Sequence, residues 1–300
     1  MAPGGGGQRG GTGAVRRAGL RDAPLLPPLP LPGGGGAMSA QSRARFAQEA
    51  RSERPDLALL CLLLAAEADP ELDERAMDWA QIELDRLAGM LPYGLRGGKA
   101  WASAVTELLG GRMGFHGTPA DYDRLSSSLL HEVLRRRRGL PILLSVVWLE
   151  VARRAGAPVY GLGLPGHFVV GFGDPAEGLV VDPFAGGASL GAGPAEQAAE
   201  PRTPARTLDI VLRILNNIRA WASARPEQSG VALWALELSL LLPSHPASLR
   251  YERAKLLVER GQFASGAAEM ESYAEVVDAI DPPAAARIRG EALSARALLN

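Results

Sequence analysis

The chain has 300 residues, of which 47% are hydrophobic and 22% are charged, a balance that lets a globular protein bury a core. Its formal net charge of −1 provides no overall field for nucleic acid or an anionic membrane, so neither class of partner is expected. Cys61 is the single cysteine, which excludes an intramolecular disulfide and a multi-cysteine zinc site and fits a reducing, cytoplasmic environment.

Residues 1–37 are dominated by glycine and proline. Such a segment has too few side chains to bury to offset the entropy of ordering, so we predict a disordered arm. Met38 stands just before the first helix-like pattern, and we interpret it as a candidate native start. Detection by mass spectrometry of an N-terminal peptide from upstream of Met38 would refute this hypothesis.

Residues 38–115 carry helical patterning, with Leu57, Leu60, Cys61 and Leu64 at spacings of three and four. The apolar run 57–66 is about half the length that a membrane-spanning helix needs, so it predicts a buried helix. A thiol in that apolar stripe has a raised pKa and is inert, so we interpret Cys61 as a core residue.

The segment 116–200 is predicted to form the core. A helix is expected at 126–138, where Gly139 breaks it, and Pro141 opens a second helix over 142–155 that is apolar nearly all round. The arginine run 135–138 is interpreted as a solvated helix end, with an anion site as the alternative.

Three strands follow, at 159–164, 167–172 and 179–184, with GDPAEG as the turn between the last two. If this turn closes symmetrically, Phe172 faces Leu179 and His167 lies diagonal to Asp182 on one face of the sheet. A slip of one residue would put the imidazole and the carboxylate on opposite faces.

The C-terminal region 201–300 is helical again. After a Gly/Ala/Pro linker at about 185–205, helices are predicted at 206–224, 228–242, 246–260, 263–279 and 283–298. Their pair spacing of about thirty residues is typical of helical-hairpin repeats. Because about two pairs form only a short array, we expect them to pack against the core domain as well.

Three separated motifs carry a family resemblance: RRGLPILLS (137–145), LPGHF (164–168) and VDPF (181–184). With them the chain resembles the transglutaminase-like superfamily, and more specifically the bacterial SirB-type proteins with C-terminal tetratricopeptide-like helices, over about residues 40–290. The resemblance implies an α+β fold: a transglutaminase/papain-like core of a central helix and a small antiparallel sheet, flanked by N-terminal helices and C-terminal TPR-like hairpins.

Enzymes of that superfamily use a cysteine, a histidine and an aspartate, and the resemblance places the last two on His167 and Asp182. The cysteine position at the start of the central helix falls on Pro141, which has no nucleophilic atom. The remaining pair is interpreted as a buried structural hydrogen bond, as a ligand-recognition pair, or as part of a residual catalytic site.

Two further arrangements would also involve His167 and Asp182. Ser145, one turn beyond Pro141, is the best substitute nucleophile, although a hydroxyl there is expected to bond back to the carbonyl of residue 141. His131 with His167 and Asp182 would form a metal-binding set, but the spacing carries no metal signature, and no metal or other cofactor is expected. His116 and His245 are interpreted as turn residues.

We therefore expect a non-catalytic transglutaminase-like protein that binds a protein or peptide partner. The alternative is an acyl-transfer or amide-hydrolysing enzyme that uses His167 and Asp182 with a nucleophile such as Ser145.

Overall fold

The computed structural model describes residues 37–190 and 203–299, so the predicted disordered arm, apart from its last residue, and most of the predicted linker lie outside the described residues. Four helices come first: α1 (Ala37–Glu49), α2 (Leu57–Ala68), α3 (Glu74–Ala88) and α4 (Gly98–Val105), which continues as a wider π-helical turn η1 (Thr106–Arg112). Aspartates start two of them, because Asp56 accepts from the amide of Leu59 at 2.9 Å and Asp73 from that of Ala76 at 2.8 Å.

The central helix is α6 (Pro141–Arg154), preceded by the short helices η2 (Pro119–Asp123), η3 (Leu125–Ser128) and α5 (Leu130–Arg136). α6 begins with Pro141 in its first turn, as predicted, and every residue from Pro141 to Ala152 is buried. The predicted start of α5 at residue 126 is wrong. The carbonyl of Ser127 accepts from the amide of Leu140 at 2.9 Å and the Ser127 hydroxyl donates to Asp121 at 3.1 Å, and these contacts hold residues 125–128 in the separate 3-10 turn η3 before α5 begins at Leu130.

The sheet has four antiparallel strands in the order β1-β2-β3-β4: β1 (Val159–Leu164), β2 (His167–Phe172), β3 (Leu179–Asp182) and β4 (Ala188–Ser189). Phe172 pairs with Leu179, which confirms the predicted register. β3 ends two residues earlier than predicted because Asp182 Oδ1 accepts from the amide of Phe184 at 2.9 Å and turns the chain at Pro183.

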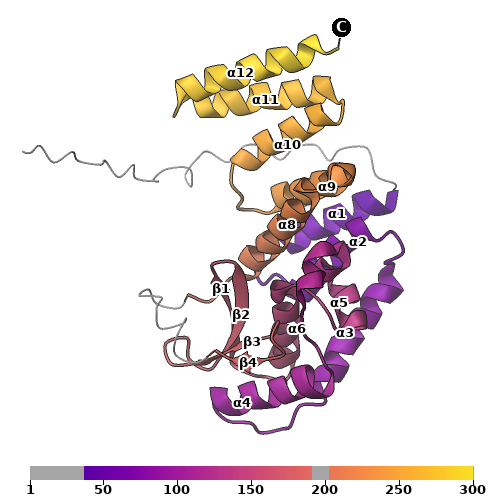
Figure 1. Ribbon diagram of the computed structural model, residues 1–300, viewed down its shortest axis with the longest axis vertical. Coiled ribbons are helices and arrows are strands. Elements are labelled where there is room, and N and C mark those ends of the chain that lie inside the picture. The colour runs from indigo at the N-terminus through magenta and orange to yellow at the C-terminus, as the bar shows by residue number, and fades with distance from the viewer. Residues whose placement is uncertain (1–36, 191–202, 300) are drawn as a thin grey trace, which may run out of the picture.

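The C-terminal helices are α8 (Thr207–Ser223), α9 (Ser229–Leu241), α10 (Ser248–Glu259), α11 (Phe263–Asp278) and α12 (Pro282–Ala297), with a short turn η4 (Pro226–Gln228) before α9. Each begins and ends within two residues of the prediction. In Figure 1, α8 and α9 lie against the core, whereas α10, α11 and α12 stack beyond them as successive antiparallel helices.

The main hydrophobic core surrounds α6, which packs on the sheet with one side and on α3 and α5 with the other (Figure 1). α10, α11 and α12 enclose a separate apolar cluster that includes Met270, Tyr273 and Ile288. This mixed architecture confirms the predicted α+β fold. None of the helices in the described residues has the length and apolar composition that a bilayer crossing requires.

Candidate functional site

A histidine and an aspartate from neighbouring strands meet at one edge of the sheet. His167 begins β2 and Asp182 ends β3, and His167 Nε2 lies 3.0 Å from Asp182 Oδ2. Their side chains are 28% and 13% exposed. Asp182 Oδ1 is held by the amide of Phe184, so the carboxylate is fixed on both oxygens and in turn fixes the imidazole ring.

Aromatic rings form one wall beside this pair. The ring of Phe184 meets the ring of His167 edge-on, with centroids 6.4 Å apart, and Tyr122 packs on the other side of Phe184 at 5.9 Å. Burial and the negative charge of Asp182 raise the pKa of the Tyr122 phenol, which therefore stays protonated. Gly117 is required here because a Cβ at that position would lie 2.0 Å from the Phe184 ring.

A pocket of about 360 Å³ opens over the start of α6. His167 and Pro141 both line it from the core side, and Tyr122 and Asp123 line it from η2. The opposite wall is α8, which contributes Arg213, Asn217, Ala220 and Trp221, followed by Arg225. The pocket is therefore shared between the sheet-bearing core and the first C-terminal helix.

Arg213 fixes the β1–β2 turn against α8. Its Nη2 donates to the carbonyls of Leu164 at 2.8 Å and His167 at 2.7 Å, and its guanidinium lies 5.5 Å from the centre of the Phe168 ring. Burial lowers the pKa of Arg213. Arg213 is not among the residues that the sequence motifs single out. The spacing of four between Arg213, Asn217 and Trp221 was the available signal that one face of a helix carries all three.

Ser145 does not bond back to residue 141, and that expectation is wrong. Its hydroxyl donates to the carbonyl of Phe168 at 3.1 Å, and the residue is fully buried. The bond crosses from α6 to β2 and helps to hold the strand that begins with His167. Ser145 lies below the pocket and is not among the residues that line it.

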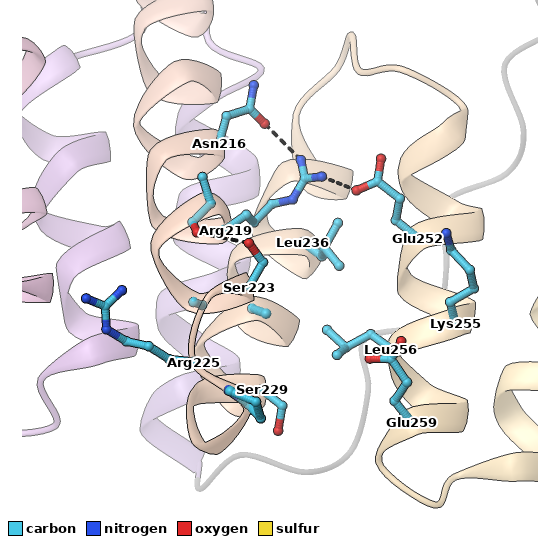
Figure 2. Close-up of a pocket in the computed structure, with 14 residues that line it drawn as sticks. Asn216, Arg219, Ser223, Arg225, Ser229, Leu236, Glu252, Lys255, Leu256 and Glu259 are labelled. Carbon is cyan, nitrogen blue, oxygen red and sulfur yellow. Dashed lines mark hydrogen bonds and ion pairs between the residues drawn. The ribbon is translucent and has the colours of Figure 1, made fainter. Parts of the chain in front are cut away.

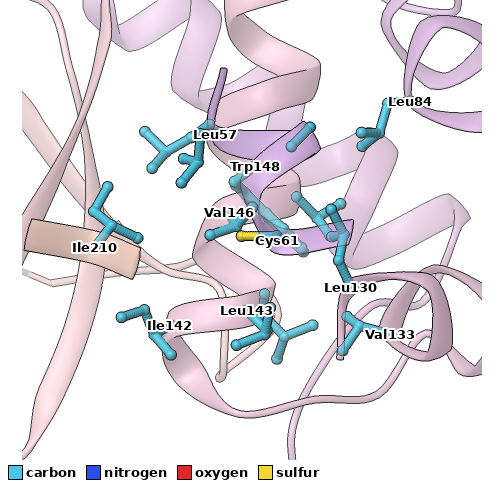
Figure 3. Close-up of a cluster of buried hydrophobic side chains, with 14 of the residues drawn as sticks. Leu57, Cys61, Leu84, Leu130, Val133, Ile142, Leu143, Val146, Trp148 and Ile210 are labelled. Atoms are coloured by element: carbon cyan, nitrogen blue, oxygen red, sulfur yellow. The ribbon is translucent and has the colours of Figure 1, made fainter. Parts of the chain in front are cut away.

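Cys61 lies in the core, as predicted. It is buried in the cluster that Figure 3 shows, beside Val146, Leu143 and Trp148 of α6. Burial raises the pKa of its thiol far above the ordinary value, with smaller contributions in the same direction from Glu150 and Asp56. The thiol is therefore unavailable to the pocket.

The other histidines lie elsewhere. His131 Nε2 bonds Asp69 Oδ2 at 3.1 Å, so the set of His131, His167 and Asp182 is not assembled, and the described residues contain no group of three or more side chains that could hold a metal ion. Nδ1 of His116 and Nδ1 of His245 each bond a nearby backbone carbonyl, at 3.1 and 2.8 Å, as turn residues do.

The arginine run 135–138 at the end of α5 is solvated in part, since Arg135 and Arg137 are exposed, but it also makes contacts within the chain that the sequence did not predict. Arg136 donates to the hydroxyl of Ser126 at 2.6 Å. Arg137 ends the helix in the left-handed conformation, with φ of 57°. Arg137 and Arg138 each donate to a backbone carbonyl of the segment 113–114 at 3.0 Å. The run thus joins α5 to the preceding loops.

Comparison with known families decides the assignment. Residues 64–221, more than half of the chain, match the model of the transglutaminase-like superfamily. The chain belongs to the transglutaminase-like superfamily. Residues 218–300 match a tetratricopeptide repeat model. The boundary between the two matches falls within α8, the helix that forms one wall of the pocket.

The transglutaminase-like chain has bacterial relatives. It is 30% identical over 189 residues to a UPF0162 protein of Xylella fastidiosa strain Temecula1, covering 58% of this chain and 67% of that protein. It is 31% identical over 100 residues to a UPF0162 protein of Vibrio cholerae, covering 32% and 37%. These matches confirm the resemblance stated from the sequence.

Two further similarities are more limited. Mouse F-box only protein 21 is 36% identical over 81 residues, which is 27% of this chain and 13% of that protein. A crystal structure of menin, described as revealing its binding site for Mixed Lineage Leukemia protein, aligns over 86% of this chain and 61% of its own, with a TM-score of 0.40 and 17% identity. At that TM-score the likeness supports no functional conclusion.

Proposed function

We propose that this protein is a non-catalytic member of the transglutaminase-like superfamily that binds a peptide or a protein loop in the pocket over Pro141. The observation that carries the proposal is the position of Pro141, which occupies the first turn of the central helix and lines the same pocket as His167. In the family pattern this is the position of the nucleophilic cysteine. Proline offers no atom that could attack a substrate.

The surrounding residues do not replace the missing thiol. Among the described residues that line the pocket, none is cysteine, serine, threonine or lysine. The phenol of Tyr122 is kept protonated by its raised pKa. Cys61 and Ser145 are both fully enclosed in the core, and the Ser145 hydroxyl is already bonded to Phe168. These contacts count against the alternative of an acyl-transfer or amide-hydrolysing enzyme that uses Ser145.

The His167–Asp182 pair is as suitable for binding a ligand as for catalysis. Because Nε2 is bound to Asp182, the ring is held in one orientation and Nδ1 is the nitrogen that remains for a ligand. Nδ1 makes no hydrogen bond to the described residues. Together with the aromatic wall and the polar side chains of α8, this gives a concave site with a few fixed polar groups, as ligand pockets usually have.

The C-terminal helices support a protein or peptide as the class of ligand. They match a repeat family that stacks helices into extended surfaces, and α8 joins that surface to the pocket. We place the protein in the cytoplasm, because its single thiol is buried and unpaired.

The proposal is tested by selecting peptides from a random display library on the full chain. We expect the selected peptides to lose binding to the Trp221→Ala and His167→Ala variants, because both side chains line the pocket. The matched control is Trp79→Ala, which removes an exposed tryptophan of α3 outside the pocket lining. Binding that survives both pocket variants, or a library that yields no binder, would refute the proposal.

The enzymatic alternative has its own test. A serine-reactive fluorophosphonate is expected to give no adduct at Ser145 when the labelled protein is mapped by mass spectrometry. A stoichiometric adduct there would revive that alternative.

A further inference from the structure

Three residues of helix α8 that carry hydrogen-bond donors lie along one face of the helix and line the pocket. Arg213, Asn217 and Trp221 are spaced by four, so they project from one face of the helix, and all three line the pocket. The Asn217 side chain makes no hydrogen bond with the described residues. Trp221 Nε1 is buried and is likewise without a partner there.

Arg213 is a partly buried cation without a carboxylate beside it. Its hydrogen bonds go to two backbone carbonyls, and burial alone accounts for its lowered pKa. No acidic side chain of the described chain lies within ion-pair distance of Arg213. A desolvated charge in this state gains the most from an anionic partner, because it has already lost part of its hydration.

A second cation stands at the edge of the same pocket. Arg225 lies over the Trp221 ring, 4.6 Å from its centre, and donates to the Trp221 carbonyl at 2.9 Å. Its acidic partner is Asp123, at 3.4 Å, whose side chain is 80% exposed. An ion pair this long and this exposed contributes little, so a ligand carboxylate can compete with Asp123 for Arg225.

The acids around the pocket do not balance these cations. Among the described residues of the lining, Asp123 is the only acidic one, and Asp182, which is outside the lining, has both oxygens engaged, by His167 and by the amide of Phe184. The pocket therefore presents two guanidinium groups and an amide to a ligand, with a single exposed carboxylate to neutralise them. The ligand that satisfies such a set is one that supplies acceptor oxygens with negative charge.

An adjoining groove shows the contrasting arrangement. It has a volume of about 600 Å³, lies between α8 and α10, and shares Ala220 and Arg225 with the pocket. Figure 2 shows Arg219 reaching across this groove to Glu252, whereas Arg225 points away from it. Arg219 is thus already paired with Glu252, and the groove lining also carries Lys255 and Glu259, which are of opposite sign. The shared residues make the groove a path by which a peptide could leave the pocket.

We propose that the pocket recognises the carboxylate of a peptide, which binds Arg213 and Asn217 beside His167 and draws Arg225 from Asp123, while the rest of the peptide passes Ala220 into the groove. This inference rests on the proposed function and specifies the chemistry of its ligand. The carboxylate comes from an acidic side chain or from the C-terminus of the peptide.

The test measures by NMR whether each of three small probes binds to the full chain. Acetyl-Glu-N-methylamide carries only a side-chain carboxylate, acetyl-Gly carries only a C-terminal carboxylate, and acetyl-Gln-N-methylamide is the neutral counterpart of the first. The indole resonance of Trp221, assigned with the Trp221→Phe variant, reports binding. We expect at least one acidic probe to shift this resonance in a saturable manner. The glutamine probe should leave the resonance unchanged at the same concentration. The acidic probe that binds more tightly identifies the source of the carboxylate.

Variants then assign the contact. Arg225→Gln is expected to weaken binding of the acidic probe about tenfold, as loss of a charge-assisted hydrogen bond does. Asp123→Asn is expected to strengthen it, because it removes the competing carboxylate. Arg206→Gln is the matched control: it makes the same substitution at the N-terminal end of α8, outside the pocket lining, and is expected to have no effect.

The outcomes separate this inference from the function on which it rests. Equal shifts with the acidic and neutral probes, no shift with any probe, or an acid affinity unchanged by Arg225→Gln would overturn carboxylate recognition. If library peptides still bind in a Trp221-dependent way, the proposed binding function stands and only its ligand chemistry is wrong. If neither peptides nor acids bind, both fail.

Discussion

Pro141 combines two features: it begins the central helix, and it lines the same pocket as the imidazole that Asp182 holds in place. A side chain placed at the first turn of a helix lies in the positive field of the helix N-terminus, which favours an anion. We infer that the site has kept the surroundings of a nucleophile while holding a residue that cannot react.

The Pro141→Cys variant tests this inference at the level of one residue. We expect the new thiol to have a pKa below its ordinary value of about 8.5, because the helix N-terminus and the neighbouring imidazole of His167 both favour the thiolate. The pH dependence of its alkylation by iodoacetamide measures this pKa. Native Cys61 is buried and should not interfere.

The matched control adds His167→Ala to the Pro141→Cys chain. Removing the imidazole should move the thiol pKa back toward 8.5 while the helix contribution remains. If the thiol of the single variant titrates at its ordinary value, His167 is not placed to act on residue 141.

Glu150, on the opposite half of α6, provides a test of pH dependence. Burial is the main cause of its raised pKa, and Asp56 adds to it, whereas Arg153 and Arg154 oppose it. A raised folded-state pKa means that this carboxyl supports folding below its unfolded-state pKa, about 4.3, and that the support is lost as pH rises through the folded-state value.

The Glu150→Gln variant should therefore gain stability relative to the native chain as pH rises from about 4 to about 8, by on the order of 1 kcal/mol. Urea unfolding at several pH values measures the difference in the free energy of unfolding. Glu71→Gln, at an exposed position, is the control and should show no such trend. A Glu150→Gln difference that is flat with pH would contradict the assignment.

At the scale of elements, the bond from Ser145 to Phe168 links α6 directly to β2. The Ser145→Ala variant removes the donor and leaves the carbonyl without this partner in the core. We expect a loss of about 1–2 kcal/mol in the free energy of unfolding, measured by urea titration. Ser294→Ala, which removes an exposed hydroxyl bonded to a carbonyl of its own helix, should cost much less. Equal losses of unfolding free energy in the two variants would show that the buried bond stabilises the protein no more than the exposed one.

The elements that could be predicted from the sequence are those with strong local signals. The proline at the start of α6, the short strand-like runs of β1 and β2, and the turn at 173–178 each specify their own structure, and the turn also sets the strand register. The register is what brings His167 and Asp182 together, so this half of the site follows from sequence.

The elements that the sequence did not predict depend on tertiary contacts. The wide turn η1 places Gly110 so close to the backbone of Gly186 that a Cβ there would lie 1.9 Å from the Gly186 carbonyl oxygen, which is a relation between residues far apart in the chain. Strand β4 is only two residues long and carries no pattern of its own. The pocket wall was missed for the same reason: the spacing of Arg213, Asn217 and Trp221 predicts one helix face but not which surface that face meets.

At the scale of the whole molecule, a chain of partly buried ion pairs joins the N-terminal helices to the repeats. Glu67 of α2 binds Arg43 of α1 at 2.7 Å, Arg43 binds Glu237 of α9 at 2.8 Å, and Arg253 of α10 binds both Glu237 and Glu269 of α11. This network crosses from the main core to the separate cluster of α10, α11 and α12.

The Arg253→Ala variant should therefore destabilise the protein by about 3 kcal/mol, because it leaves Glu237 and Glu269 short of a partner in a site where Arg253 is only 9% exposed. Urea unfolding followed by circular dichroism measures the loss. Arg289→Ala breaks a more exposed pair with Asp278 and should cost less than about 1 kcal/mol. A cost for Arg253→Ala as small as that of the control would show that the repeats do not depend on this network.

The central claim is that the pocket binds a peptide without reacting with it. This is tested most directly by following one selected peptide in a single sample with the native chain. Its affinity is measured by fluorescence anisotropy and its mass by mass spectrometry over a prolonged incubation. We predict saturable binding that requires His167 and Trp221, with the peptide recovered at its original mass and no adduct on the protein. Cleavage, deamidation or acyl transfer that disappears in the His167→Ala variant would contradict the account.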